Sequence, residues 1–157
     1  MKFISAIFTV VEFFNMNFRL MILKLQGAKI GKNVKIYGKI KVVNPKKLIV
    51  GCNVTFNEGV YLNCKEEVFI DDNCRLSAYS MLISTQLENL GHSGKRGHIS
   101  SPIFLGKNVW ICAGAIIGMG VELNDGITVA SNSFVNKSFD VKNSVVGGTP
   151  AKYLKNV

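Results

Sequence analysis

The sequence of 157 residues is short of several features that would mark particular classes of protein. It has only two histidines, three prolines, ten acidic residues against nineteen basic ones, and four cysteines without a Cys-x-x-Cys pair. The scarcity of proline and the 48% content of apolar residues argue against a disordered chain. Because the cysteine spacing does not fit a zinc ribbon, we expect reduced thiols in a cytoplasmic protein. At this length, one domain with a buried core is the expected organisation.

The excess of basic residues is not concentrated in one part of the chain. The formal net charge is +9, and lysines and arginines are spread from Lys2 to Lys155. No basic arm typical of nucleic-acid binding stands out, so no nucleic-acid partner is expected. A basic surface suits an anionic ligand or an anionic membrane equally well.

The first 26 residues are apolar but do not resemble a signal peptide or a membrane-spanning segment. Glu12 interrupts the apolar run, and no small-x-small cleavage site follows. Apolar residues recur at helical spacing instead, which predicts an amphipathic helix over 1–26. This stripe consists of Phe3, Ile7, Val10, Val11, Phe14, Phe18, Met21 and Ile22. Two roles stay open for it: packing on the domain or a neighbouring subunit, and peripheral association with the inner face of a membrane.

A repeat of six residues runs through the rest of the chain, 27–157. Branched apolar residues recur at every sixth position, and a second set, mostly smaller, follows four residues after each. The first set is Leu105, Ile111, Ile117, Leu123, Val129 and Val135, and the second is Val109, Ala115, Val121, Ile127, Ser133 and Phe139. The same spacing occurs upstream in Ile30 and Ile36, in Val50, Phe56 and Leu62, and in Ile70, Leu76 and Leu82. A period of six fits a short strand and a turn that direct every sixth side chain into a shared interior.

Three such units make one triangular coil, and stacked coils predict an all-β parallel solenoid of about five coils. Two irregularities interrupt the repeat. Two extra residues fit a bulge at 64–67, and seventeen extra residues between Ile70 and Leu105 predict an inserted loop at about 86–101. That loop contains both histidines, His92 and His98.

The chain resembles the hexapeptide-repeat acyltransferases, in particular the sugar O-acetyltransferases of the maltose/galactoside and surface-polysaccharide type. The resemblance rests on GAKIGKNVKI (27–36), on PIFLGKNVWICAGAIIGMGVELNDGITVASNSFVNKSF (102–139) and on VVGGTPAKYL (145–154). It implies a left-handed parallel β-helix and a homotrimer with active sites between subunits. It also implies acetyl-CoA as acyl donor, no metal, and a sugar hydroxyl as acceptor in surface polysaccharide or O-antigen biosynthesis.

Direct acyl transfer to a hydroxyl needs a general base, and imidazole, which titrates near neutral pH, suits that task. The catalytic histidine of similar enzymes usually follows the strand before the inserted loop, where this chain has Gln86. Three alternatives stay open: His98, close to where the chain rejoins the repeat; His92, near the middle of the loop; or neither. Glu88 is the candidate supporting carboxylate.

The resemblance also assigns residues to the two substrates. Positions that match those near the coenzyme are Trp110, Ala113, Gly114, Ser131, Lys137, Gly148 and Lys152. Candidates from earlier coils for contacts with the acceptor are Tyr61, Asn63, Ser84 and Gln86.

Three other functions are weighed against sugar O-acetylation. N-acetylation of an amino sugar is the nearest variant, and a non-catalytic β-helix scaffold is favoured by Gln86 at the expected histidine position. A carbonic anhydrase of the same fold is disfavoured, because its zinc site needs three histidines and this chain has two.

Overall fold

The computed structural model describes residues 16–88 and 97–157. They form a helix over 16–25 and a column of short β-strands. The predictions for 1–15 and for His92 concern residues outside these ranges.

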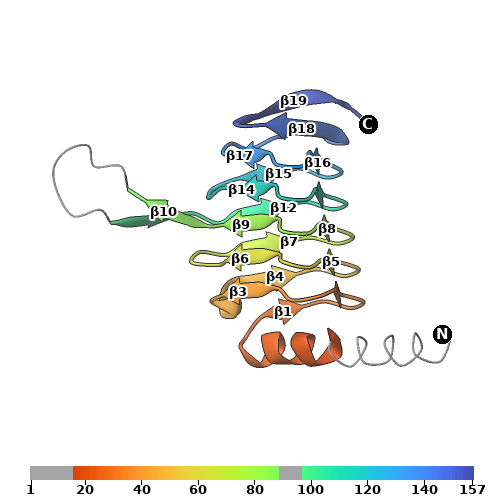
Figure 1. The fold of residues 1–157 in the computed structure, drawn as a ribbon, viewed down its shortest axis with the longest axis vertical. Helices are drawn as coiled ribbons and strands as arrows, with labels where there is room; N and C mark the ends of the chain where they lie inside the picture. The colour runs from red at the N-terminus through yellow and green to blue at the C-terminus, as the bar shows by residue number, and fades with distance from the viewer. Residues whose placement is uncertain (1–15, 89–96) are drawn as a thin grey trace.

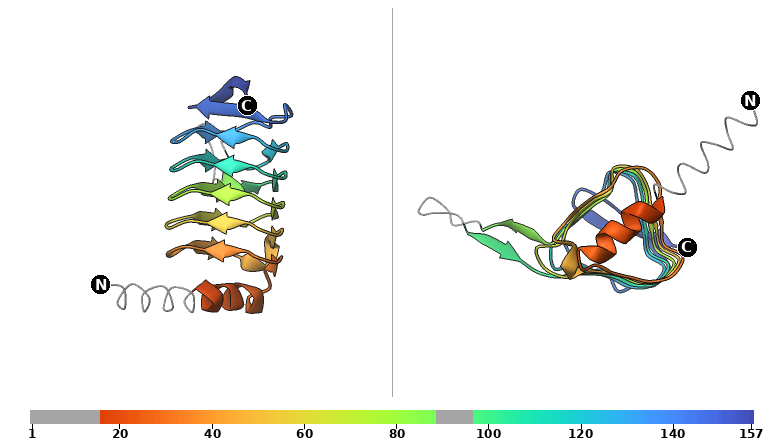
Figure 2. Two further views of the ribbon diagram at one scale, coloured as in Figure 1. Left: turned by 90° about the vertical axis from the view of Figure 1, so that its right-hand side faces the viewer. Right: turned by 90° about the horizontal axis from the view of Figure 1, so that it is seen from below.

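Three sheets form the faces of a triangular column (Figures 1 and 2). Sheet A contains β1 (Lys29–Ile30), β4 (Leu48–Val50), β7 (Val68–Ile70), β12 (Ile103–Leu105) and β15 (Glu122–Leu123). Sheet B contains β2 (Lys35–Ile36), β5 (Thr55–Phe56), β8 (Arg75–Leu76), β13 (Trp110–Ile111), β16 (Thr128–Val129), β18 (Ser144–Gly148) and β19 (Ala151–Asn156). Sheet C contains β3 (Lys41–Val43), β6 (Tyr61–Asn63), β9 (Met81–Ile83), β14 (Ile116–Ile117) and β17 (Phe134–Val135).

The chain visits the sheets in the order A, B, C, and each round is one coil. Neighbouring coils pair in parallel, and only β19 in these three sheets is antiparallel, to β18. The described residues make five complete coils, and β18 belongs to a sixth. The predicted parallel solenoid is therefore confirmed.

The six-residue repeat supplies the interior of the column. All six residues of the first set from Leu105 onward are at most 2% exposed, and the second set is equally buried through Ser133. Phe139 is only partly buried, because the last coil meets β15 there through one isolated bridge, to Leu123. Each fully buried aliphatic side chain contributes about 1.5–3 kcal/mol, so stacking of neighbouring coils stabilises the fold.

Asparagines form one column of corners, between sheets A and B. Asn33, Asn53, Asn73 and Asn108 have φ between 55° and 62°, a left-handed conformation that asparagine tolerates better than most residues. The side-chain amide of Asn33 donates to Oδ1 of Asn53 over 3.2 Å, and that of Asn53 donates to Oδ1 of Asn73 over the same distance. These bonds tie successive coils together at the turn.

The extra residues all lie at the corner between sheets C and A, which we call the C–A corner. Coil 1 turns there through a 3-10 helix, η1 (Pro45–Lys47), and the predicted bulge at 64–67 separates β6 from β7. The long insertion separates β9 from β12, and its ends pair as an antiparallel ribbon of β10 (Thr85–Leu87) and β11 (His98–Ser100). The ribbon projects away from the column (Figures 1 and 2). The ends of the predicted loop are therefore strands.

Helix 16–25 lies across the N-terminal end of the column (Figure 2). Its Met16, Leu20 and Leu23 pack against the core. In contrast, Phe18 and Met21 of the predicted stripe are 57% and 49% exposed. Phe18 and Met21 thus face away from the domain, whereas Ile22 lies at the edge of this face and lines a pocket with Ile40. No described helix is long and apolar enough to cross a bilayer.

Candidate active site

The ribbon carries the described candidates for acid–base chemistry. His98 is exposed on β11, opposite Leu87. The Glu88 backbone N–H donates to the carbonyl of Gly97 over 2.8 Å, and the Glu88 Oε2 atom lies 3.3 Å from the place a Gly97 Cβ would occupy. Adjacent residues of a strand project to opposite faces, so the carboxylate lies on the other face of the ribbon from His98, and its predicted role in supporting the imidazole gains no support within one chain.

Two of the acceptor candidates lie on the outer face of sheet C, one coil below the ribbon. Tyr61 and Asn63 are half-buried on β6, and Asn63 pairs in register with Ile83 at the start of the insertion. The Lys41 ammonium lies 5.8 Å from the centroid of the Tyr61 ring. Gln86 is exposed on β10. These residues and His98 therefore approach the same corner.

Ser84 holds that corner together instead of facing solvent. It is fully buried, and its hydroxyl donates to the Asn63 carbonyl over 2.8 Å and accepts from the Glu66 N–H over 2.9 Å. Within a single chain, this hydroxyl is engaged in fixing the base of the ribbon, so its predicted contact with the acceptor gains no support.

A second group of predicted residues gathers at the corner between sheets B and C, the B–C corner. Ala113 and Gly114 lie between β13 and β14, Ser131 lies between β16 and β17, and Gly148 ends β18. Three successive coils thus place them one above another. Gly114 has φ of +69°, and a Cβ there would lie 2.3 Å from Oδ1 of Asn132. The close stacking of this corner requires glycine, and it presents backbone rather than bulky side chains.

Trp110 precedes this corner on the outer face of sheet B. Its side chain is 47% exposed, and its indole N–H donates to the Ser77 hydroxyl over 2.9 Å. Ser77 was not among the predicted site residues. The repeat could have indicated it, because Arg75 is the register partner of Trp110 on the coil below. Ser77 follows Arg75 by two residues and therefore lies on the same face of sheet B as the indole.

The two lysines assigned to the coenzyme lie apart. Lys152 is exposed on β19, opposite Gly147, and so lies near the B–C corner. Lys137 follows β17 at the C–A corner, and its ammonium lies 5.5 Å from the centroid of the Phe139 ring. One chain therefore does not bring Lys137 to the other coenzyme candidates.

All four thiols are free, and burial suppresses the ionisation of three of them. Burial raises the pKa of Cys64 and of Cys74 to about 12. Partial burial also raises the pKa of Cys112, beside Ala113, although a hydrogen bond with Ser131 offsets part of this rise. These three thiols therefore stay protonated near neutral pH. No three histidine, cysteine, aspartate or glutamate side chains in the described ranges are grouped to hold a metal.

The two groups of residues do not meet within one chain. The ribbon leaves from the C–A corner, whereas Ala113, Gly114, Ser131 and Gly148 line the B–C corner, and sheet C lies between them. Sheet C therefore separates the base of the ribbon from the donor candidates in one chain.

The chain is similar to known acetyltransferases over most of its length, although no family model matches it. It is 32% identical over 138 residues to the putative colanic acid biosynthesis acetyltransferase WcaF of Escherichia coli K12, a match that covers 87% of this chain and 74% of WcaF. The maltose O-acetyltransferase of Clostridium difficile 630 has a TM-score of 0.80 at 26% identity, covering 88% of this chain and 74% of that one. A hexapeptide-repeat acetyltransferase of Vibrio cholerae, solved with acetyl coenzyme A, shares the fold, with a TM-score of 0.79 at 21% identity over 88% of this chain and 75% of that one.

Proposed function

The chain belongs to the hexapeptide-repeat acetyltransferases, and from that premise we propose that it acetylates a sugar hydroxyl during surface polysaccharide biosynthesis, with acetyl-CoA as donor. The observation that carries this proposal is the match to WcaF along 87% of the chain. The name of that relative assigns it to colanic acid biosynthesis. The B–C corner suits the donor, because its stacked glycine and exposed backbone allow an extended ligand to approach closely.

We propose His98 as the general base. It accepts the proton of the sugar hydroxyl while the oxygen attacks the thioester carbonyl, and the C–S bond then breaks. His98 returns the proton to the departing sulfur, so the products are the acetyl ester and free coenzyme A. Its position on the paired strand β11 favours it, because a base must be held in place.

We propose a homotrimer in which the ribbon of one chain reaches the B–C corner of the next. Leu87 and Ile99 are 50% and 37% exposed on the ribbon, and a two-stranded ribbon without a covering surface is only marginally stable. A neighbouring copy would cover these side chains and join the base to the donor. The same arrangement would bring Lys137 of one chain towards the donor bound by another.

Measuring coenzyme A release with hydroxylated sugars and with amino sugars tests the proposed reaction. The expected result is one free thiol for each acetyl ester, which mild alkali removes. An alkali-stable amide made only from amino sugars would instead establish N-acetylation. Tight coenzyme A binding without turnover on any acceptor would favour a scaffold.

We propose further that helix 16–25 lies on the cytoplasmic face of a membrane. Phe18, Met21, Ile22 and Leu25 have the spacing of one helical face, and all are at least 37% exposed. The same apolar pattern continues towards Phe3 in the sequence. An amphipathic helix of this kind inserts its apolar face into the membrane interface.

Sedimentation with lipid vesicles tests the membrane proposal. The double variant Phe18→Ser/Met21→Ser is expected to lose vesicle binding. The matched control, Val141→Ser/Leu154→Ser, removes apolar side chains of similar exposure from the opposite end and is expected to bind as the parent does. Equal losses in both variants would contradict a role for the helix.

A further inference from the structure

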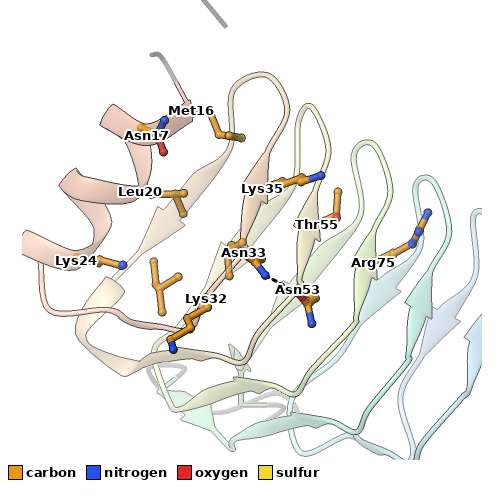
Figure 3. A pocket seen from close by; sticks show the side chains of 13 residues that line it. Met16, Asn17, Leu20, Lys24, Lys32, Asn33, Lys35, Asn53, Thr55 and Arg75 are labelled. Atoms are coloured by element: carbon orange, nitrogen blue, oxygen red, sulfur yellow. Dashed lines mark hydrogen bonds between the residues drawn. The ribbon is translucent and has the colours of Figure 1, made fainter. Parts of the chain in front are cut away.

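A groove of about 970 Å³ separates helix 16–25 from the outer surface of the first coils (Figure 3). Four of its lining residues are basic and none is acidic. The basic residues are Lys24, Lys32, Lys35 and Arg75. They come from different elements, because Lys24 belongs to the helix, Lys32 to a corner, and the other two to strands of sheet B.

The repeat itself aligns the cations on the sheet side of the groove. Lys35, Thr55 and Arg75 are register partners on three successive strands, so their side chains leave sheet B in one column (Figure 3). Successive strands lie about 4.8 Å apart, which places Arg75 about 10 Å above Lys35. Asn33 and Asn53 add polar amides to the lining and are hydrogen-bonded to each other.

These positive charges have no ion-pair partner among residues 16–88 and 97–157. The two ion pairs found there, Lys47 with Glu66 and Lys142 with Asp125, both lie outside the groove. A concave surface with several charges of one sign concentrates ions of the opposite sign. The groove is therefore suited to an anionic group such as a phosphate.

We propose that the groove binds the phosphate of an anionic phospholipid headgroup, an inference that rests on the membrane association proposed above. The exposed stripe of helix 16–25 faces away from the column, and the groove lies on the column side of the same helix. A helix is about 10 Å across, and an interfacial helix sinks its apolar face about 5–10 Å into the membrane. The groove then lies at headgroup level, and the solenoid stands on the membrane by its N-terminal end.

Two variants with the same change of charge test this assignment. The groove variant is Lys24→Gln/Lys32→Gln/Lys35→Gln, and the control variant is Lys107→Gln/Lys142→Gln/Lys155→Gln, which removes three charges from upper coils. Each basic residue close to an anionic membrane contributes about fivefold to binding, so the groove variant should lose on the order of 100-fold in affinity for vesicles containing phosphatidylglycerol. The control residues lie beyond the screening length of about 10 Å from the membrane, so that variant should keep its affinity.

Vesicles of phosphatidylcholine alone separate the two proposals. The groove variant should bind these neutral vesicles as the parent does, whereas Phe18→Ser/Met21→Ser should bind neither kind. If the parent binds both vesicles equally, or if both triple variants lose affinity equally, the headgroup site is wrong while the membrane helix stands. If the parent binds no vesicles, the membrane association fails, and the headgroup site fails with it. All six substituted residues are exposed, so each variant should fold. An unfolding temperature equal to that of the parent would verify this.

Discussion

The B–C and C–A corners are built from the same six-residue repeat but present different chemistry. The B–C corner is regular in coils 4 and 5, and together with the end of β18 it exposes backbone around Ala113, Gly114 and Gly148. The C–A corner accommodates every insertion and projects His98 and Glu88 on a ribbon. A regular corner is suited to binding an extended donor, and an interrupted one can place side chains far from the column. The proposed mechanism therefore uses both corners.

Of all changes at the two corners, removal of the His98 imidazole from the ribbon should reduce activity most. His98→Ala is expected to lower kcat/KM by about 10²–10⁴-fold, the usual contribution of a general base. Because His98 is exposed, the unfolding temperature should not change. Steady-state kinetics with a sugar acceptor measures the loss.

His92→Ala is the matched control and should retain most of the activity. The reverse result would transfer the role of base to His92. Full activity in both variants would rule out the histidine mechanism.

Charging the apolar side chains of the ribbon should weaken the trimer. Each buried aliphatic side chain contributes about 1.5–3 kcal/mol, so Leu87→Asp/Ile99→Asp should weaken association by about 100-fold or more. Sedimentation velocity would show a shift from trimer towards monomer. Val141→Asp, a similarly exposed residue near the top of the column, should leave the assembly intact. An unchanged trimer in the ribbon variant would mean that another surface covers the interface.

A negative side chain at the B–C corner should impair donor binding. Ala113 is exposed, so Ala113→Glu should fold, and it should raise KM for acetyl-CoA about tenfold through repulsion of the donor phosphates. Its effect on kcat should be smaller. Val141→Glu, which is 47% exposed at the corner between sheets A and B, is the control and should leave KM unchanged. Equal effects of the two substitutions would remove the distinction between the corners.

The thiols at the two corners should differ in their rates of alkylation. This is the smallest of the expected effects. A pKa of about 12 leaves roughly one part in ten thousand of Cys64 as thiolate at pH 8, so iodoacetamide should spare it until the protein unfolds. Labelling should increase as the pH rises towards that value. Cys112 should react faster, and bound coenzyme A should slow it severalfold.

Cys52, at the third corner, is the internal reference and should react equally with and without coenzyme A. Peptide mass spectrometry distinguishes the sites. Equal protection of Cys52 and Cys112 would argue against donor binding at the B–C corner.

The repeat made most of the fold predictable, because the spacing of Leu105, Ile111 and Ile117 is local information that states which side chains share an interior. The pairing of β10 with β11 was not predictable in this way, since it joins residues across a segment without periodicity. The burial of Ser84 was missed for a related reason. Its hydroxyl bonds to Asn63 and Glu66 on the coil below, which the sequence places about twenty residues away.

The helix shows a second reason why the sequence did not predict every contact. In the described part of the stripe, Phe18, Met21 and Ile22 have the spacing of one helical face, but periodicity does not state what that face contacts. Met16, Leu20 and Leu23 lie off the stripe, and they are the residues that close the end of coil 1. The site residues show the same limit, because the resemblance grouped Lys137 with Ala113, while the fold of one chain separates them by the width of sheet C.

Subunit complementation tests the central claim, that each active site combines the ribbon of one chain with the B–C corner of another. Equal amounts of His98→Ala and Ala113→Glu would be unfolded together and allowed to reassemble. In randomly mixed trimers, about a quarter of the intersubunit sites receive both an intact ribbon and an intact corner. With acetyl-CoA well below the parent KM, the expected result is therefore about a quarter of the parent activity, above the tenth or so that Ala113→Glu retains alone. Activity no higher than the mean of the two variants would contradict the account.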